Sequence, residues 1–535
     1  MGFRATGERI PSPRGLRQHR ASNNHGATLA CGKALGYRAR VWTCNVIEAV
    51  QTVFPYWDGN RFSDETANPR GAKVPALECP WEKKHRHDSR REKTVSTNRT
   101  RIGVKAKASP DLVFTSLYHH IADVDNLREC FHALQGSKAV GVDDVTKSTY
   151  AKDLEANLRN LSARLKRMGY RPQPKRRIYI PKPGSEKGRP LGISTFEDKI
   201  VELATKRVVE PIFESMFEES SYGYRPRRSP HHCIDALGKT IQQKRVNFIV
   251  EADIRSFFDR VNHEWLLKFL QQRIGDHRVL RLITRMLKAG IMEDGLVHAG
   301  EVGTPQGSIL SPLLSNIYLH YVLDLWFQRR IRRGCRGEAY LFRFADDFLA
   351  CFERQSDADQ FRTALGDRME KFHLELAEEK TRHLEFGRYA RAKAHRSGRK
   401  PGEFEFLGMA FYCGKTRYGS FKVKRKTSRK KLRQSLARFT DWIQRYRNLL
   451  PSGELLRRAR ARVNGHLNYY AITDNSDNCH LYMHLTSRVL FKWLNRRSQR
   501  KSYTWVGFNQ ALRHIGWPSP RIRVNMNPFS PKLNV

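Results

Sequence analysis

Hydrophobic and polar positions along the chain alternate between helical spacing and short apolar runs. Leucines recur at helical spacing over residues 152–168, and apolar positions do so again over residues 198–217, which predicts two amphipathic helices. Runs rich in aromatic and β-branched residues predict strands over residues 177–180, 247–254 and 404–411. This mixture of helices and short strands predicts an α+β fold.

One pair of apolar runs encloses two adjacent acids. Residues 341–345 and 348–352 each predict a strand, and Asp346 and Asp347 stand between them. The acids are therefore expected at the tip of a hairpin. Aspartate is also a common turn former, so the pair alone fits a simple turn as well as a metal site.

The two ends of the chain differ from its middle. Residues 1–105 are rich in Gly, Pro, Asn and Arg and have little periodicity, which predicts a poorly ordered basic extension of unknown role. The sequence leaves open whether this extension binds RNA or is translated from a start upstream of the natural one. Apolar patterning marks a second region at 106–415, and three apolar stripes at helical spacing predict a helical domain over 425–525.

The net charge points to a polyanionic partner. The chain has 98 Lys and Arg against 53 Asp and Glu, a formal charge of +45, and nucleic acid is the partner expected for such an excess. Residues 425–535 alone contain 23 Lys and Arg against 4 Asp and Glu. No apolar run is long enough for a membrane span, so no membrane partner is expected. The nine cysteines form no C-x-x-C pair, which argues against a zinc ribbon and favours a reducing compartment.

Three acids could act together. Asp253 lies near the end of the strand predicted over 247–254, and Asp346 and Asp347 lie on the later hairpin. Two-metal catalysis uses carboxylates that bridge two divalent ions about 3.5–4 Å apart. Mg²⁺ takes one or two carboxylates together with phosphate oxygens and water. Convergence of the two strands would therefore create a site for two Mg²⁺ ions.

Other stretches carry groups suited to nucleotides. Lys182 and Arg189 stand in a loop rich in Pro and Gly, where a point charge and a bidentate fork suit a triphosphate. Gln306 is flanked by Gly303 and Gly307, so the backbone there can approach a ligand closely. Residues 221–228 interleave aromatics with arginines, a pattern typical of nucleic-acid backbone binding. An exposed basic loop is the alternative for the cationic stretches.

The order of these motifs resembles the reverse transcriptases encoded by group II introns, from about residue 111 to about residue 523. Phe344-Ala-Asp-Asp347 is similar to that family's Tyr-Ala-Asp-Asp box, and residues 253–259 resemble its first catalytic strand. Residues 304–319 are similar to its nucleotide-pocket motif. Further similarities are Arg189-Pro-Leu-Gly-Ile193 and Ser221-Tyr-Gly-Tyr-Arg-Pro226 (fingers), Phe406-Leu-Gly408 (primer grip), and Gly465-His-Leu-Asn-Tyr-Tyr470 with Trp493-Leu-Asn-Arg-Arg497 (maturase domain).

The resemblance implies a right-hand polymerase, with fingers and an antiparallel palm sheet followed by an α-helical thumb or maturase domain. It implies an RNA-directed DNA polymerase that copies intron RNA and assists splicing and mobility. The implied metal ligands are Asp253, the Ile254 carbonyl, Asp346 and Asp347. The implied nucleotide contacts are Lys182, Arg189, Phe258 as steric gate, Gln306 and Lys380; the grip is Phe406, Leu407 and Gly408; and the RNA-binding arginines are Arg225, Arg457, Arg458, Arg460 and Arg462.

The implied partners are an RNA template (group II intron RNA), a DNA target or primer, and dNTPs. The expected location is the cytoplasm, with the bacterial nucleoid, or an organelle; the oligomeric state stays open. Phe344 replaces the family's usual Tyr, and no cysteine-paired H-N-H nuclease follows the maturase region. Two alternatives are a reverse transcriptase adopted by the host, for instance in antiphage defence, and a splicing-only RNA-binding maturase. The presence of all three aspartates favours the enzyme.

Overall fold

The computed structural model describes residues 89–181, 188–298, 300, 302–499 and 502–528. The chain divides into two units, residues 1–45 and 46–535, and every described residue belongs to the second. In the part of the chain that the structure describes, no helix has the length and apolar character needed to cross a membrane.

Helix α2 (Ser89–Ala108) begins within the predicted extension and ends three residues beyond it. Its Ile102 and Ala106, four residues apart and so on one helix face, are 8% and 1% exposed. A Cβ atom at Gly103 would lie 3.4 Å from the Pro211 side chain of helix α7 (Phe196–Glu214). The prediction of poor order is therefore wrong for residues 89–105, because a small apolar face suffices to pack this helix on α7. Residues 1–88 lie outside the described residues.

The helices around α2 and α7 form the first half of the second unit. The helix predicted over 152–168 is confirmed as α6, and Thr146 begins α5 by accepting a hydrogen bond from the Thr149 N–H at 3.1 Å. Their cores merge into one apolar cluster that also contains α7. The elements are α3 (Tyr118–Ile121), α4 (Val124–Ala133), α5 (Lys147–Ala151) and α6 (Leu154–Lys166).

A first sheet has the strand order β2-β1-β4-β5. Strands β1 (Lys175–Ile180) and β2 (Arg189–Ile193) are antiparallel, with Ile178 opposite Leu191. Strand β4 (Ile291–Glu293) runs parallel to β1, and β5 (Leu296–His298) returns antiparallel to β4.

A second, fully antiparallel sheet has the order β6-β7-β3-β8. Along β3, Ile249 packs in the same apolar cluster as helix α8 (Pro230–Gln243), while Val250 packs with helix α14 (Gln355–Lys371). Burial of both faces explains why these strands read as continuous apolar runs. The strands are β3 (Phe248–Ala252), β6 (Ala339–Phe344), β7 (Asp347–Phe352) and β8 (Arg382–Glu385).

Helices between β3 and β8 complete the core beneath this sheet. Helix α12 (Ser311–Leu319) begins directly after the Gly303–Gly307 loop and continues into two π-helical segments, His320–Asp324 and Phe327–Ile331. The remaining elements are α9 (Phe257–Arg260), α10 (His263–Gln271), α11 (His277–Leu287), α13 (Arg332–Gly334) and the 3₁₀ turn Glu378–Lys380.

A third sheet corrects one prediction. Residues 404–411 form two strands instead of one: β9 (Glu403–Phe406) and β10 (Met409–Lys415) pair as a hairpin. The turn consists of Leu407 and Gly408, with φ of +49° and +77°. Strand β11 (Phe421–Thr427) completes the order β11-β10-β9. The apolar run continues through the turn, so periodicity alone does not mark the reversal.

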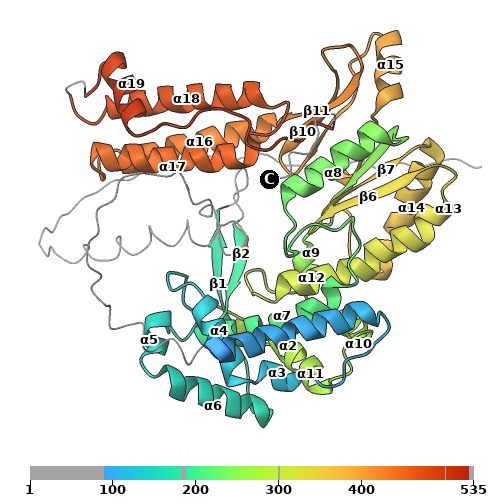
Figure 1. Cartoon of the computed structure of the whole chain (residues 1–535), viewed down its shortest axis with the longest axis vertical. Helices are drawn as coiled ribbons and strands as arrows, with labels where there is room; N and C mark the ends of the chain where they lie inside the picture. Colours follow the sequence, from blue (N-terminus) through green and yellow to red (C-terminus); the bar gives the residue numbers. More distant parts are fainter. Residues whose placement is uncertain (1–88, 182–187, 299, 301, 500–501, 529–535) are drawn as a thin grey trace, which may run out of the picture. The chain divides into compact units, whose positions relative to one another are not determined.

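The C-terminal region is helical, as predicted. Figure 1 shows α16 (Arg429–Tyr446), α17 (Ser452–Tyr470) and α18 (Ser476–Leu494) lying side by side. Helix α19 (Trp505–His514) packs on the same apolar cluster through Phe508 and Leu512. Helix α15 (Arg388–Arg396) lies between β8 and β9.

Candidate active site

The Phe344–Asp347 hairpin tip is sharply bent. Phe344 and Asp347 form the last pair of the β6–β7 ladder, so Ala345 and Asp346 alone make the turn. Ala345 is 7% exposed and has a φ of +59°, a left-handed conformation that strains a residue bearing a Cβ atom. A strained backbone conformation of this kind persists only when the surrounding residues stabilise it.

A buried arginine holds the tip. Arg343, 0% exposed, makes a bidentate ion pair with Asp324, which is also 0% exposed, at 2.6 and 2.7 Å. Its Nη1 donates to the Ala345 carbonyl at 3.0 Å and to Asn316 Oδ1 at 2.9 Å, and its Nη2 donates to Ser221 Oγ at 2.7 Å. Arg343 therefore ties the tip to α12, to the π-helical turn and to the Ser221 loop.

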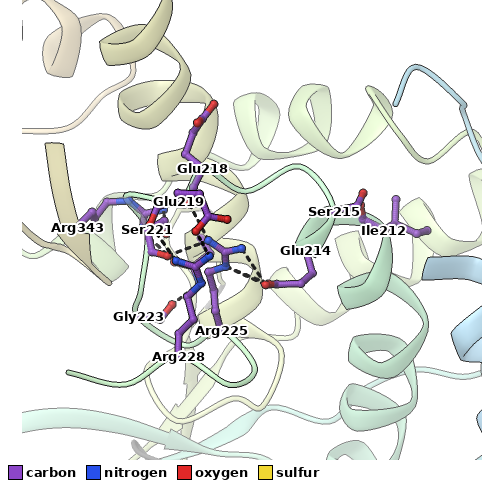
Figure 2. Close-up of polar contacts among 11 residues, drawn as sticks. Ile212, Glu214, Ser215, Glu218, Glu219, Ser221, Gly223, Arg225, Arg228 and Arg343 are labelled. Carbon is purple, nitrogen blue, oxygen red and sulfur yellow. Dashed lines mark hydrogen bonds and ion pairs between the residues drawn. The ribbon is translucent and has the colours of Figure 1, made fainter. Parts of the chain in front are cut away.

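The Ser221 loop lies directly on the hairpin. A Cβ atom at Gly223 would lie 2.1 Å from the Ala345 nitrogen, so only glycine allows this approach. Asn316 Nδ2 donates to the Gly223 carbonyl at 2.7 Å. Figure 2 shows Arg343 beside Ser221. The loop that resembles a fingers motif is thus a support of the acidic tip.

Asp253 follows the last residue of β3. Because Ala252 stands opposite Phe348, the register carries Asp253 toward Asp347 on the neighbouring strand. The Asp253 carbonyl accepts from the Ala377 N–H and the Arg255 N–H donates to the Glu375 carbonyl, both at 2.8 Å. These two bonds flank Ile254, which pairs with Leu376 as an isolated antiparallel bridge. The structure therefore brings Asp253, Asp346 and Asp347 to one end of the central sheet.

The carboxylates repel one another. Burial, followed by Asp346 and Asp253, raises the pKa of Asp347 to about 7. Burial and the Asp253 charge also raise the pKa of Asp346. Among the described residues no side chain donates a hydrogen bond to the Asp347 carboxylate. Carboxylate oxygens are hard donors of the kind that a divalent ion such as Mg²⁺ takes.

Lys380 meets this group from the 3₁₀ turn. Its Nζ donates to Asp253 Oδ2, and the carboxylate raises the pKa of Lys380 in turn. Within the described residues no three His, Cys, Asp or Glu side chains are gathered as a metal cluster. In this structure Lys380 neutralises one of the three acids.

The Gln306 loop is anchored on both sides. The Gln306 carbonyl accepts from the Gly192 N–H at 2.7 Å, and the Thr304 N–H donates to the Phe258 carbonyl at 2.7 Å. Gly307 has a φ of +110°, and a Cβ atom there would lie 2.8 Å from the Gly192 carbonyl oxygen. The loop therefore bridges strand β2, which begins at Arg189, and the turn that contains Phe258.

Beneath this loop lies a buried acid that the sequence did not reveal. Glu202 on α7 is 1% exposed and accepts from Lys175 Nζ, Ser194 Oγ and the Ile309 N–H, each at 2.9 Å. Lys175 holds the pKa of Glu202 below its usual value in spite of the burial that would raise it. This network joins β1, β2 and the Gln306 loop. A charged residue among apolar helix positions is the signal that could have found it.

The remaining predicted nucleotide contacts differ in placement. Arg189 is exposed. Its positive charge partly offsets the rise in the pKa of Asp346, so Arg189 lies near the acids. Phe258 is half-buried, whereas Phe257 is 2% exposed and packs near Tyr318. Phe258 is therefore the more accessible ring of the two. Lys182 lies outside the described residues.

The prediction that Arg225 binds RNA is contradicted. Arg225 is 4% exposed and pairs with Glu214 through Nε and Nη2 at 2.8–3.1 Å (Figure 2). Its Nη1 donates to the carbonyls of Glu218 at 2.7 Å and Ser221 at 2.8 Å. The Arg225 guanidinium forms its hydrogen bonds within the protein. These bonds hold the loop that supports the acidic tip.

The predicted grip residues form the β9–β10 turn. Phe406 is buried, and Leu407 and Gly408 make the turn itself. The Gly408 carbonyl accepts from the Ser428 N–H at 3.1 Å, which places the turn at the start of α16. Lys431 lies in the first turn of α16, and its positive charge partly offsets the rise in the pKa of Asp347. The β9–β10 turn, which is bonded to the start of α16, therefore also lies near the acids.

The arginines of α17 do not share one environment. Arg457 and Arg458 are exposed and pair with Glu454 at 2.9 and 2.7 Å. Arg460 is exposed. Arg462 is half-buried with its guanidinium 4.5 Å from the Trp442 ring centroid, and burial lowers its pKa. The open arginine face, defined as Arg457, Arg458 and Arg460, is therefore smaller than predicted.

Comparison with known proteins adds independent information. Residues 180–411 match the family described as reverse transcriptase (RNA-dependent DNA polymerase). The chain is 38% identical over 229 residues to the group II intron-encoded protein LtrA of Lactococcus lactis subsp. cremoris, covering 42% of this chain and 38% of LtrA. It is 31% identical over 397 residues to protein YkfC of Escherichia coli K12, covering 68% of this chain and 99% of YkfC. It is also 40% identical over 147 residues to an uncharacterized 91 kDa protein in the cob intron of Schizosaccharomyces pombe, covering 28% of this chain and 18% of that protein.

Proposed function

Because the chain belongs to the family of group II intron-encoded reverse transcriptases and maturases, we propose that it copies intron RNA into DNA and assists splicing and mobility of the intron. The similarity covers 38% of the length of LtrA, and the proposed activity rests on the residues of the site in this chain. The observation that supports the proposal most is the position of Asp253, Asp346 and Asp347 at one end of an antiparallel sheet, where the charges of Asp253 and Asp346 act on Asp347.

The sheets and helices then take the roles of a right-hand polymerase. The β6-β7-β3-β8 sheet is the palm, and the β2-β1-β4-β5 sheet with the helices around α7 is the fingers. Helices α16, α17 and α18 form the thumb or maturase domain. We assign the domain limits 106–415 and 425–525 on this basis, with α2 added to the first.

The acids bind divalent metal in this proposal. Asp253, Asp346, Asp347 and the Ile254 carbonyl would hold two Mg²⁺ ions, and the chemistry supplied by such ions would be a lower pKa of the attacking hydroxyl and stabilisation of the leaving pyrophosphate. Burial, followed by the charges of the neighbouring carboxylates, raises the pKa values of Asp346 and Asp347, and a bound cation would favour their charged forms. Asp253 would bind metal in place of Lys380, and Lys380 would then be available to a phosphate.

The nucleotide lies between the fingers and the palm. Arg189 and Lys182 bind its phosphates, and Gln306 contacts it from a loop that Gly192 and Glu202 hold in place. Phe258 packs against the sugar and excludes a ribose 2′-hydroxyl. The partners are accordingly dNTPs, an RNA template and a DNA primer or target, and the expected location is the cytoplasm with the nucleoid, or an organelle.

A primer-extension assay tests the proposal. The full-length protein, given a DNA primer annealed to an RNA template, is expected to extend the primer with dNTPs and Mg²⁺. EDTA should abolish extension, and rNTPs should replace dNTPs poorly. A protein that binds the primed template but extends it with neither Mg²⁺ nor Mn²⁺ would instead favour the splicing-only maturase.

The arginine face is expected to bind RNA phosphates. Replacing Arg457, Arg458 and Arg460 by Gln should weaken binding to structured RNA and lower the slope of log K against log salt by about 0.7–0.9 for each phosphate that the protein no longer neutralises. Filter binding at several salt concentrations measures both quantities. The control removes the same charge from exposed positions on α2, by Arg101→Gln, Lys105→Gln and Lys107→Gln. Equal losses of affinity in the two variants would show diffuse attraction and no specific face.

A further inference from the structure

The β9–β10 turn rests on the C-terminal end of helix α17. The Tyr469 hydroxyl donates to the Leu407 carbonyl at 2.7 Å. A Cβ atom at Gly408 would lie 3.0 Å from the Tyr470 hydroxyl oxygen, so this position accommodates little more than glycine. Two adjacent tyrosines of α17 therefore contact the two residues of the turn, and within the described part of the chain only the Tyr469 hydroxyl hydrogen-bonds to it.

Leu407 adopts an unfavourable backbone conformation. Its φ of +49° lies in the left-handed region, which costs free energy for a residue with a branched side chain. The Tyr469 hydroxyl binds the carbonyl of this same residue and so favours the strained conformation. Burial raises the pKa of Tyr469, which keeps the hydroxyl protonated and able to donate.

Tyr469 is itself held from two sides. His231, at the start of α8, donates through Nε2 to the Tyr469 carbonyl at 2.8 Å. Asn475, 1% exposed, donates to the Tyr470 carbonyl at 2.7 Å and accepts from the Thr427 N–H of β11 at 2.8 Å. The end of α17 is thus bound to the palm through α8 and to the grip sheet through β11.

We propose that Tyr469 is a positioning residue for the primer: its hydroxyl holds the Leu407–Gly408 turn in the conformation that receives the primer strand. This inference rests on the proposed function, because it takes the turn as the primer grip. Arg460 lies nine residues before Tyr469 on the same helix, about 14 Å along its axis. Through Tyr469, the helix that carries the arginine face also determines where the primer end lies.

Two single-atom changes test the proposal. Tyr469→Phe removes the hydroxyl that binds Leu407, and we expect the KM for primed template to rise about 2- to 10-fold, as for loss of one buried hydrogen bond, with shorter products per binding event. The KM for dNTP should stay within about twofold of the wild-type value, since the Gln306 loop has its own anchors at Gly192 and Phe258. Tyr470→Phe is the matched control, because no hydrogen bond from its hydroxyl occurs among the described residues.

Thermal melting of both variants checks that the fold is intact. An unchanged primer KM and product length in Tyr469→Phe would overturn the proposal. So would an equal rise in the two variants, or an equal rise in the KM for primer and for dNTP, since either would indicate general damage. Absence of extension by the wild-type protein is a different result, because it refutes the proposed function before Tyr469 is tested.

Discussion

Replacing both Asp346 and Asp347 by Ala is expected to reduce cDNA synthesis on a primed RNA template by on the order of 10³-fold or more. The two carboxylates are adjacent at the hairpin tip and lie near Asp253, so their loss removes most of the oxygen donors for divalent metal. Primer extension at several Mg²⁺ concentrations measures the effect. Extra Mg²⁺ should not restore synthesis, because the ligands themselves are missing.

The same variant should keep its fold and its RNA affinity. The pKa of Asp347 is raised above its unfolded value, so its charged form opposes folding at pH values above that unfolded pKa, and its removal at pH 8 costs no stability through charge. The control is Asp367→Ala with Glu370→Ala, which removes two exposed acids from α14. Synthesis at more than a few per cent of the wild-type rate would exclude these aspartates as metal ligands.

Arg343→Met is expected to lower the stability of the protein by about 3–5 kcal/mol, because it leaves the Asp324 carboxylate buried without a counter-charge. The urea midpoint of unfolding and the melting temperature report this loss. Arg343→Met combined with Asp324→Leu should regain much of it, since removal of both buried partners is far less costly than removal of one.

The double variant separates stability from activity. It restores an apolar core but lacks the donor to the Ala345 carbonyl, which holds the strained turn. We therefore expect the double variant to be folded and still deficient in cDNA synthesis. Equal stability of Arg343→Met and the wild-type protein would contradict the buried ion pair. Full synthesis by the double variant would show that the turn needs no such support.

Several features could be predicted from the chain because they depend on neighbouring residues. Apolar periodicity identified α6, the strand before Asp253 and the C-terminal helices, since burial of one face or two imposes the pattern locally. The same pattern predicted the hairpin that carries Asp346 and Asp347. It could not show the turn at Leu407 and Gly408, where the apolar run passes through the reversal.

Arginines show the limit most clearly. Arg225 and Arg343 both stand among aromatic residues, and the sequence does not say whether such a guanidinium faces RNA or an acid of the same chain. Their partners, Glu214 and Asp324, come from other elements, so only packing decides. Arg457, on the amphipathic helix α17, is exposed and pairs only with Glu454 of its own helix among the described residues.

The sequence by itself determined the local elements and the chemical types available: three aspartates, a glutamine between glycines and a large positive charge. The tertiary structure decided which of these groups meet. The strand register places Asp253 toward Asp347. Arg343, paired with Asp324, holds the hairpin tip, and the Tyr469 hydroxyl donates to the Leu407 carbonyl. The physical reason is that helix and strand patterns arise from burial within a few residues, whereas strand register and buried charge pairs depend on contacts between distant segments.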